Sequence, residues 1–270
     1  MRIRVGHSDD PDDAFMYWGI ASGAVEADGY EFEQVIEDIQ TLNERALRAE
    51  LEVTAMSAAA YPRVCGRYLL LPHGASIGSG YGPIVVAREP LSPDELRTTE
   101  IVVPGELTTA FLVLGLALGA EFPYRVLPFD RIQPEVADGR AAAGLLIHEG
   151  QLTYRDAGLH KCLDLGEWWL RETGLPLPLG VNAIRRDLGD GPVHDVSAIL
   201  RRSIDAALEH RDEALEYALR FGRGLDADRA DEFVAMYVNE LTRDYGDEGR
   251  RAIRELYERA GVDIAVQFAE

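Results

Sequence analysis

The order of strand and helix patterns along the chain constrains its fold more than any other feature. In the first half, short runs rich in β-branched and aromatic residues alternate with helical patterns, which is typical of parallel α/β units. A glycine-rich loop at 74–82 precedes the last of these strands. We expect these strands and helices at 2–7, 14–20, 30–36, 38–49, 51–56, 57–64, 68–71 and 83–87.

A second series of the same kind begins after Pro90, with elements expected at 101–103, 108–118, 124–127, 132–137, 143–148 and 162–165. Pro176 and Pro178 then forbid a helix, so residues 174–188 are expected to run extended. The tail from about 194 has helical spacing throughout. Two series joined by two extended crossings predict two lobes, residues 1–88 with 180–270 and residues 89–179, and a ligand cleft between them.

Charge and composition exclude several classes of protein. The formal net charge is −20, and such a field repels the phosphate backbone of nucleic acids. The first ten residues turn polar before a hydrophobic leader forms, and no apolar stretch is long enough for a membrane span. Cys65 and Cys162 lie too far apart for a close-spaced zinc site. We therefore expect a cytoplasmic protein without a metal, bound neither to membrane nor to nucleic acid.

Common catalytic and nucleotide-binding motifs are absent from the chain. No Gly-Lys pair is present for a phosphate-binding P-loop, and Pro83 interrupts the dinucleotide fingerprint. The pair His148-Glu149 begins like a zinc-protease motif, but Leu152 stands where its second histidine belongs. Residues 74–78 match a nucleophile elbow, yet a strand follows where that motif requires a helix.

Polar residues at the expected strand ends carry more information. After the first strand, Asp12 or Asp13 is expected as a helix N-cap, and the alternative is that Ser8 and Asp13 face the cleft. Ser57 ends the third strand. It either caps the next helix or, with the amides of Ala55 to Ser57, binds a ligand carboxylate.

The second lobe repeats this arrangement. Thr108 and Thr109 stand at a helix N-terminus, where they either form an anion site or act as an ordinary cap. His148 closes the strand expected at 143–148, and a near-neutral pKa makes histidine the natural proton carrier at a cleft. The alternative is a histidine that only hydrogen-bonds the ligand.

An ordered set of short motifs extends over nearly the whole chain, and each of them is weak alone. Because of this set, the chain resembles the 1,4-dihydroxy-6-naphthoate synthase family of the futalosine route to menaquinone. It departs from the family pattern at Asp12, where asparagine is common, and at Ala14, where threonine is common. The motifs are Ser8-x-x-Pro11-x-Asp13-x-Phe15, Glu37-Asp38 with Leu42-Asn43, Ser57-x-x-x-Tyr61, Gly80-x-Gly82-Pro83-x-Val85-Val86-Ala87, Pro104-Gly105-x-x-Thr108-Thr109-Ala110, Asp130-Arg131-Ile132, Ile147-His148-Glu149, Asp164-Leu165-Gly166-x-Trp168-Trp169 and the run from Thr173 to Gly180.

The resemblance implies a two-lobed periplasmic-binding-protein-like fold (type II) with a helical C-terminal tail. It implies a lyase that converts cyclic dehypoxanthinyl futalosine to 1,4-dihydroxy-6-naphthoate without metal or organic cofactor. The family's proposed base falls on His148, and its substrate contacts fall on Ala55, Met56 and Ser57 and on Thr108 and Thr109.

The expected partner is a small carboxylated metabolite, and a homodimer remains open. Two other functions fit the same architecture. One is a non-catalytic cytoplasmic binding protein for small carboxylates. The other is a sister enzyme such as a chorismate dehydratase, although the segments 147–149 and 173–180 favour the naphthoate branch.

Overall fold

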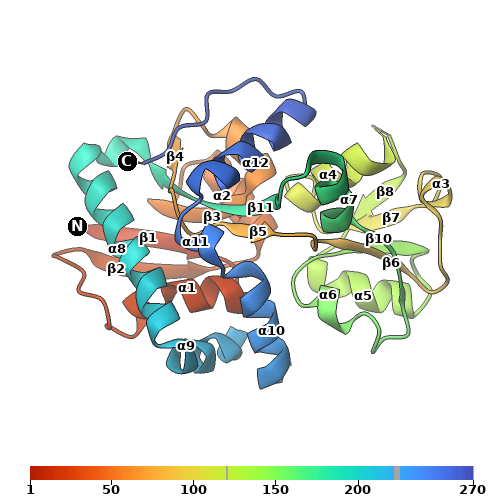
Figure 1. Ribbon diagram of the computed structural model, residues 1–270, viewed down its shortest axis with the longest axis horizontal. Coiled ribbons are helices and arrows are strands. Elements are labelled where there is room, and N and C mark those ends of the chain that lie inside the picture. The colour runs from red at the N-terminus through yellow and green to blue at the C-terminus, as the bar shows by residue number, and fades with distance from the viewer. Residues whose placement is uncertain (120, 222–225, 270) are drawn as a thin grey trace.

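The computed structural model describes residues 1–119, 121–221 and 226–269, and its strands form two separate sheets, one in each lobe (Figure 1). The first sheet has the order β2-β1-β3-β11-β4, and β5 also pairs with β11. β1 runs parallel to β2 and β3, whereas β11 runs antiparallel to β3, β4 and β5. The strands are β1 (Arg2–His7), β2 (Glu31–Ile36), β3 (Val53–Ser57), β4 (Tyr68–Leu70), β5 (Ser76–Gly78) and β11 (Leu177–Arg185).

Helices from both ends of the chain cover this sheet (Figure 1). α1 packs on α8 so closely that a Cβ atom at Gly19 would lie 2.8 Å from the Cα atom of Ser203. The Ser203 hydroxyl also donates to the carbonyl of Met16 at 2.8 Å, which fixes α1 against the tail. The helices are α1 (Pro11–Ala21), α2 (Ile39–Leu47), η1 (Ala58–Arg63), η2 (Arg186–Leu188), α8 (Asp190–Glu209), α9 (Arg211–Ala218), η3 (Leu219–Phe221), α10 (Ala227–Tyr237), α11 (Glu240–Arg243) and α12 (Gly246–Arg259).

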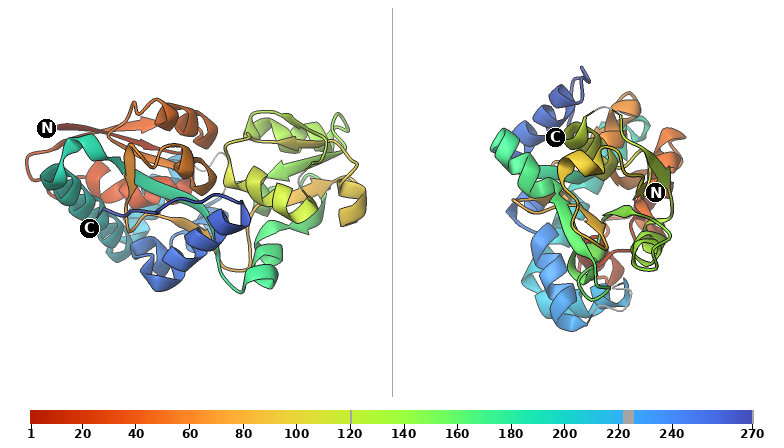
Figure 2. Two further views of the ribbon diagram at one scale, coloured as in Figure 1. Left: turned by 90° about the horizontal axis from the view of Figure 1, so that it is seen from above. Right: turned by 90° about the vertical axis from the view of Figure 1, so that its right-hand side faces the viewer.

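The second sheet has the order β10-β6-β9-β7-β8 and forms the core of the smaller lobe (Figure 2). β7 runs parallel to β8 and β9, and β6 is antiparallel to β9 and β10. Within the described ranges, no helix combines the length and apolarity needed to cross a membrane. The elements are β6 (Ile84–Ala87), α3 (Pro93–Leu96), β7 (Ile101–Val103), α4 (Thr109–Leu118), β8 (Tyr124–Val126), α5 (Phe129–Ala137), β9 (Ala143–Leu146), α6 (Gly150–Thr153), β10 (His160–Asp164) and α7 (Leu165–Thr173).

The structure confirms the two-lobed α/β architecture and corrects several details of it. β6 pairs in the second sheet, although the sequence pattern places residues 84–87 in the first lobe. Because β5 pairs in the first sheet and β6 in the second, the first crossing lies between these two strands. β5 itself lies inside the expected glycine-rich loop, and the tail ends in a non-helical segment that bridges to β4 through Leu70 and Phe268.

Candidate active site

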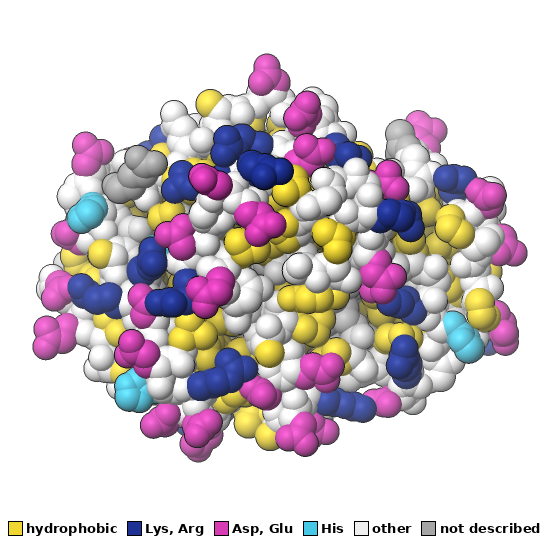
Figure 3. Space-filling view, viewed as in Figure 1, with side chains coloured by type: hydrophobic (Ala, Val, Ile, Leu, Met, Phe, Trp, Pro, Cys, Tyr) yellow, Lys and Arg dark blue, Asp and Glu magenta, His cyan; other side chains and the backbone are white. Residues whose placement is uncertain are grey.

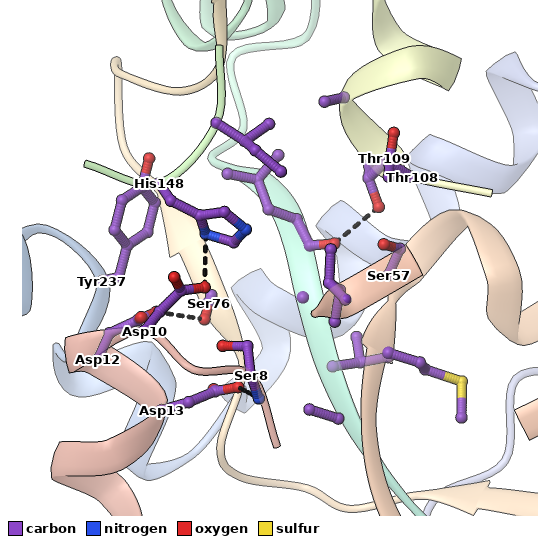
Figure 4. Close-up of a pocket in the computed structure, with 18 of the residues that line it drawn as sticks. Ser8, Asp10, Asp12, Asp13, Ser57, Ser76, Thr108, Thr109, His148 and Tyr237 are labelled. Carbon is purple, nitrogen blue, oxygen red and sulfur yellow. Dashed lines mark hydrogen bonds and ion pairs between the residues drawn. The ribbon is translucent and has the colours of Figure 1, made fainter. Parts of the chain in front are cut away.

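A pocket lies between the two lobes, and residues of both lobes line it (Figure 4). Every site residue predicted from the sequence lines this pocket: Ser8, Asp13, Ala55, Met56, Ser57, Thr108, Thr109 and His148. The polar lining residues that the sequence did not single out as ligand contacts include Asp10, Asp12, Ser76, Gln151, Asn182 and Tyr237.

The beginning of α1 forms the first-lobe wall of the pocket. Pro11 occupies the first helical position, which its fixed φ favours, so the N-cap is Asp10. The prediction of Asp12 or Asp13 as the N-cap is therefore wrong, because both lie inside the first turn. The Asp13 carboxylate instead accepts a 2.7 Å hydrogen bond from the backbone N–H of Ser8, and the Asp12 carboxyl accepts one of 3.1 Å from the Ser76 hydroxyl.

These two carboxyl groups are buried and hold protons more tightly than exposed ones. Burial and the nearby charges of Asp13 and Asp10 raise the pKa of Asp12 to about 8. Burial also raises the pKa of Asp13, against the opposing effects of His7 and of the hydrogen bond from Ser8. Near neutrality, Asp12 is therefore able to exist both as a carboxylic acid and as a carboxylate.

His148 reaches the pocket from the second lobe. The strand expected at 143–148 ends at Leu146, and His148 lies two residues further on, with a φ of 54°. This left-handed conformation is rare for residues other than glycine. Its imidazole Nδ1 lies 2.7 Å from Oδ2 of Asp10 in the other lobe, and the Phe129 ring contacts it edge-on at 4.9 Å between centroids.

The ion pair determines how His148 titrates. Burial lowers the pKa of His148, but the charge and hydrogen bond of Asp10 outweigh it and raise the pKa to about 9. This is higher than the near-neutral value expected from sequence. Because Nδ1 is bound to Asp10, Nε2 is the ring nitrogen turned towards the pocket (Figure 4).

Ser57 sits at the end of β3 and occupies the N-cap position of η1, but its side chain forms no cap bond, so the structure does not support the interpretation of this hydroxyl as a cap. The buried side chain of Asn43 forms hydrogen bonds with both the backbone N–H and the hydroxyl group of Ser57. Asn43 accepts a 2.8 Å bond from the Ser57 N–H and donates one of 3.0 Å to the Ser57 hydroxyl oxygen. The Ser57 amide is thus occupied, and its hydroxyl proton remains available to a ligand.

Thr108 and Thr109 use their hydroxyl groups within the protein. Thr108 caps α4 by accepting from the N–H of Phe111 at 3.1 Å, and it donates to the carbonyl of Gly105. Thr109 donates to the carbonyl of Leu179 at 2.6 Å and accepts from the N–H of Ala59, which joins the two lobes. The first backbone N–H groups of α4 have no intrahelical acceptor, so an anion would bind there through amides rather than hydroxyls.

Further contacts bridge the lobes around the pocket. The Tyr237 hydroxyl on α10 donates to Gln151 on α6 at 2.7 Å, and Arg229 forms a 2.6 Å ion pair with Asp156. Across the part of the chain that the structure describes, no group of three or more His, Cys, Asp or Glu side chains could hold a metal ion.

Two α/β lobes that the chain crosses twice, with a pocket between them, define the class of periplasmic-binding-protein-like folds. Solved structures agree with this class. A Candida albicans protein described as having that generic fold superposes with a TM-score of 0.72 at 14% identity, covering 98% of this chain and 92% of its own. An alkanesulfonate-binding protein from Xanthomonas axonopodis pv. citri gives 0.70 at 11% identity, covering 99% and 96%.

The chain belongs to the family described as "Menaquinone biosynthesis", whose model matches residues 3–261. This confirms the resemblance predicted from the motifs. Proteins named 1,4-dihydroxy-6-naphthoate synthase are 42% identical in Thermus thermophilus and 36% identical in Streptomyces coelicolor. They cover 96% and 97% of this chain and 93% of each relative. A crystal structure of an Archaeoglobus fulgidus protein is 49% identical with a TM-score of 0.92, covering 96% of this chain and 97% of that one.

Proposed function

We propose that this chain is a 1,4-dihydroxy-6-naphthoate synthase, a lyase that converts cyclic dehypoxanthinyl futalosine into 1,4-dihydroxy-6-naphthoate. The names of two relatives that align over nearly the whole chain support this activity. The observation that carries it within the structure is His148, a titratable group bound to Asp10 on one side and open to the interlobe pocket on the other.

In this proposal the substrate carboxylate binds at the N-terminus of α4. The amides of Thr109 and Ala110 and the positive end of the helix dipole favour an anion there. The Ser57 hydroxyl donates a hydrogen bond to the ligand from the opposite lobe. A ligand that bound both α4 and Ser57 would hold the two lobes together, as the hydrogen bond from Thr109 to Leu179 already does.

His148 acts as the general base. Its neutral Nε2 takes a proton from a carbon next to a carbonyl group. The electron pair left on the substrate expels the sugar-derived fragment, which takes up the proton from the His148 imidazolium, and the released bicycle becomes aromatic. Asp10 on Nδ1 fixes the tautomer that leaves Nε2 unprotonated, and it stabilises the imidazolium that forms. A base must be deprotonated to act, so a pKa of about 9 makes the reaction faster as the pH rises towards that value.

We also propose a cytoplasmic location, which suits a family of biosynthetic proteins. The activity is tested by incubating the purified protein with cyclic dehypoxanthinyl futalosine, with and without EDTA, and measuring 1,4-dihydroxy-6-naphthoate by chromatography. Product formation in both samples is expected. Binding without product would identify a binding protein, and dehydration of chorismate in a parallel incubation would identify the sister enzyme.

A further inference from the structure

We propose that Asp12 and Asn182 form a subsite for hydroxyl groups of the ligand on the first-lobe wall of the pocket. The inference rests on the proposed lyase function and assigns to these two residues the sugar-derived fragment of the substrate. The His148 imidazole is paired with Asp10 and not with these two residues, although the charge of Asp12 is among those that raise its pKa.

The first observation is a pair of buried oxygen atoms that accept no hydrogen bond from any residue the structure describes. They are Oδ1 of Asp12 and Oδ1 of Asn182. The two residues are only 6% and 3% exposed, and both line the pocket. A buried polar group without a partner is costly, and both residues line one pocket, so we infer that a ligand group completes the two oxygens.

The second observation is that both side chains are fixed by the same short segment. The other carboxyl oxygen of Asp12 accepts from Ser76, and the Asn182 amide donates to the carbonyl of Gly74 at 2.9 Å. Because a carbonyl requires a donor, this bond sets the orientation of the Asn182 amide and leaves Oδ1 as the orphan atom. Gly74 has a φ of +77°, and a Cβ there would lie 2.4 Å from the Asn182 nitrogen, so the close approach requires glycine.

The hydrogen-bonding capacity of the two oxygen atoms indicates which kind of ligand group would bind them. An amide oxygen only accepts, whereas Asp12 is able to donate or accept near neutrality. A hydroxyl group is able to pair with Asn182 as a donor and with Asp12 in either protonation state. A second ligand carboxylate would be repelled by Asp10 and Asp13, which line the same wall. Figure 4 shows Asp12 and the start of α4 on opposite sides of the pocket, so the hydroxyl-bearing fragment and the carboxylate would occupy different ends.

The naphthoate product lacks the sugar-derived fragment, and this difference provides the test. We expect Asp12→Ala and Asn182→Ala each to raise the KM for cyclic dehypoxanthinyl futalosine about tenfold, the loss of roughly one hydrogen bond. The Kd for 1,4-dihydroxy-6-naphthoate, measured by fluorescence titration, should stay within about twofold. Asp12→Asn keeps an acceptor at the same place and should lie between wild type and Asp12→Ala. Asp212→Ala, on the exposed side of α9, is the matched control and should change neither constant.

Thermal unfolding of each variant shows whether it folds. If Asp12→Ala does not fold, Asp12→Asn is measured in its place. Equal weakening of substrate and product would overturn the subsite, because a general distortion of the pocket explains that result. An unchanged KM for the substrate together with an unchanged Kd for the product would also overturn the subsite. That result would mean that water molecules, and not the ligand, bind the two oxygen atoms. A wild-type protein that neither binds nor converts the substrate would instead overturn the proposed function, and the subsite with it.

Discussion

His148 combines three local features that act on one imidazole. Its left-handed backbone turns the side chain out of the strand direction, Asp10 binds Nδ1, and Phe129 packs against the ring. Asp10 comes from the other lobe, 138 positions earlier in the chain. A sequence pattern predicts His148 from its place at the end of an expected strand, but a contact between such distant residues has no local signal. Asp10 therefore could not be assigned from the sequence, and neither could the raised pKa that it causes.

The residue-scale prediction concerns Asp10→Asn. The wild-type kcat/KM should rise with pH through about 9, since the base is active only when neutral. Asparagine removes the charge that holds the proton, so the rising limb should move towards or below the ordinary histidine value of about 6.5. The maximum rate should fall, because the imidazolium that forms in the reaction loses its partner. Profiles of kcat/KM from about pH 6 to pH 10 measure both effects.

Two other acidic groups near the ring, Glu149 and Asp12, also raise the pKa of His148 and remain in that variant. Glu149→Gln is therefore the control, with a smaller shift of the limb in the same direction. A pH profile of Asp10→Asn that overlays the wild-type curve would contradict the role assigned to the ion pair.

At the scale of elements, the sequence predicts the presence of a strand more reliably than the residues at which an element begins and ends. Buried apolar runs such as β3 and β7 carry their own signal, and the structure has them within two residues of the expected positions. β5 was missed because its three residues lie among glycines and gain their pairing from β11. The N-terminus of α1 was misplaced because several aspartates in a row each fit a cap, and only Pro11 at the first helical position decides among them.

The element-scale prediction separates the amide of Thr109 from its hydroxyl. Thr109→Val removes only the hydroxyl, and Thr109→Pro removes the N–H as well. Proline fits there because position 109 is the first of α4 and Thr108 is extended, with a ψ of 146°. If the ligand carboxylate binds the helix amides, the proline variant should bind 1,4-dihydroxy-6-naphthoate about tenfold more weakly than the valine variant.

Isothermal titration of both variants provides the comparison, and their unfolding temperatures verify that α4 still forms. Equal affinities would place the carboxylate away from this helix. In that case the Thr109 hydroxyl would retain only its role in joining the lobes through Leu179 and Ala59.

At the scale of the whole molecule, the site exists only where the two lobes meet. Asp10, Ser57 and Asp12 belong to the first lobe, and His148 and α4 belong to the second. The two-lobe division followed from the restart of the strand pattern after Pro90. The contacts that join the lobes could not be predicted, because they connect surfaces whose relative orientation no local pattern specifies.

The surface charge bears on the same site. Acidic side chains outnumber arginines, and Figure 3 shows the two kinds interspersed over one face of the molecule. A net charge of −20 opposes the approach of an anionic substrate. The helix amides at α4 provide local positive potential without a lysine, which would offset this repulsion at the site that we propose for the carboxylate.

The most direct test of the central claim is single-turnover conversion of cyclic dehypoxanthinyl futalosine by His148→Asn beside the wild type. Asparagine keeps some hydrogen bonding but cannot take a proton at neutral pH. The account predicts a loss of about 10²–10⁴-fold in the rate of naphthoate formation, with folding and substrate affinity retained. A His148→Asn variant that forms 1,4-dihydroxy-6-naphthoate at nearly the wild-type rate would contradict the assignment of His148 as the base.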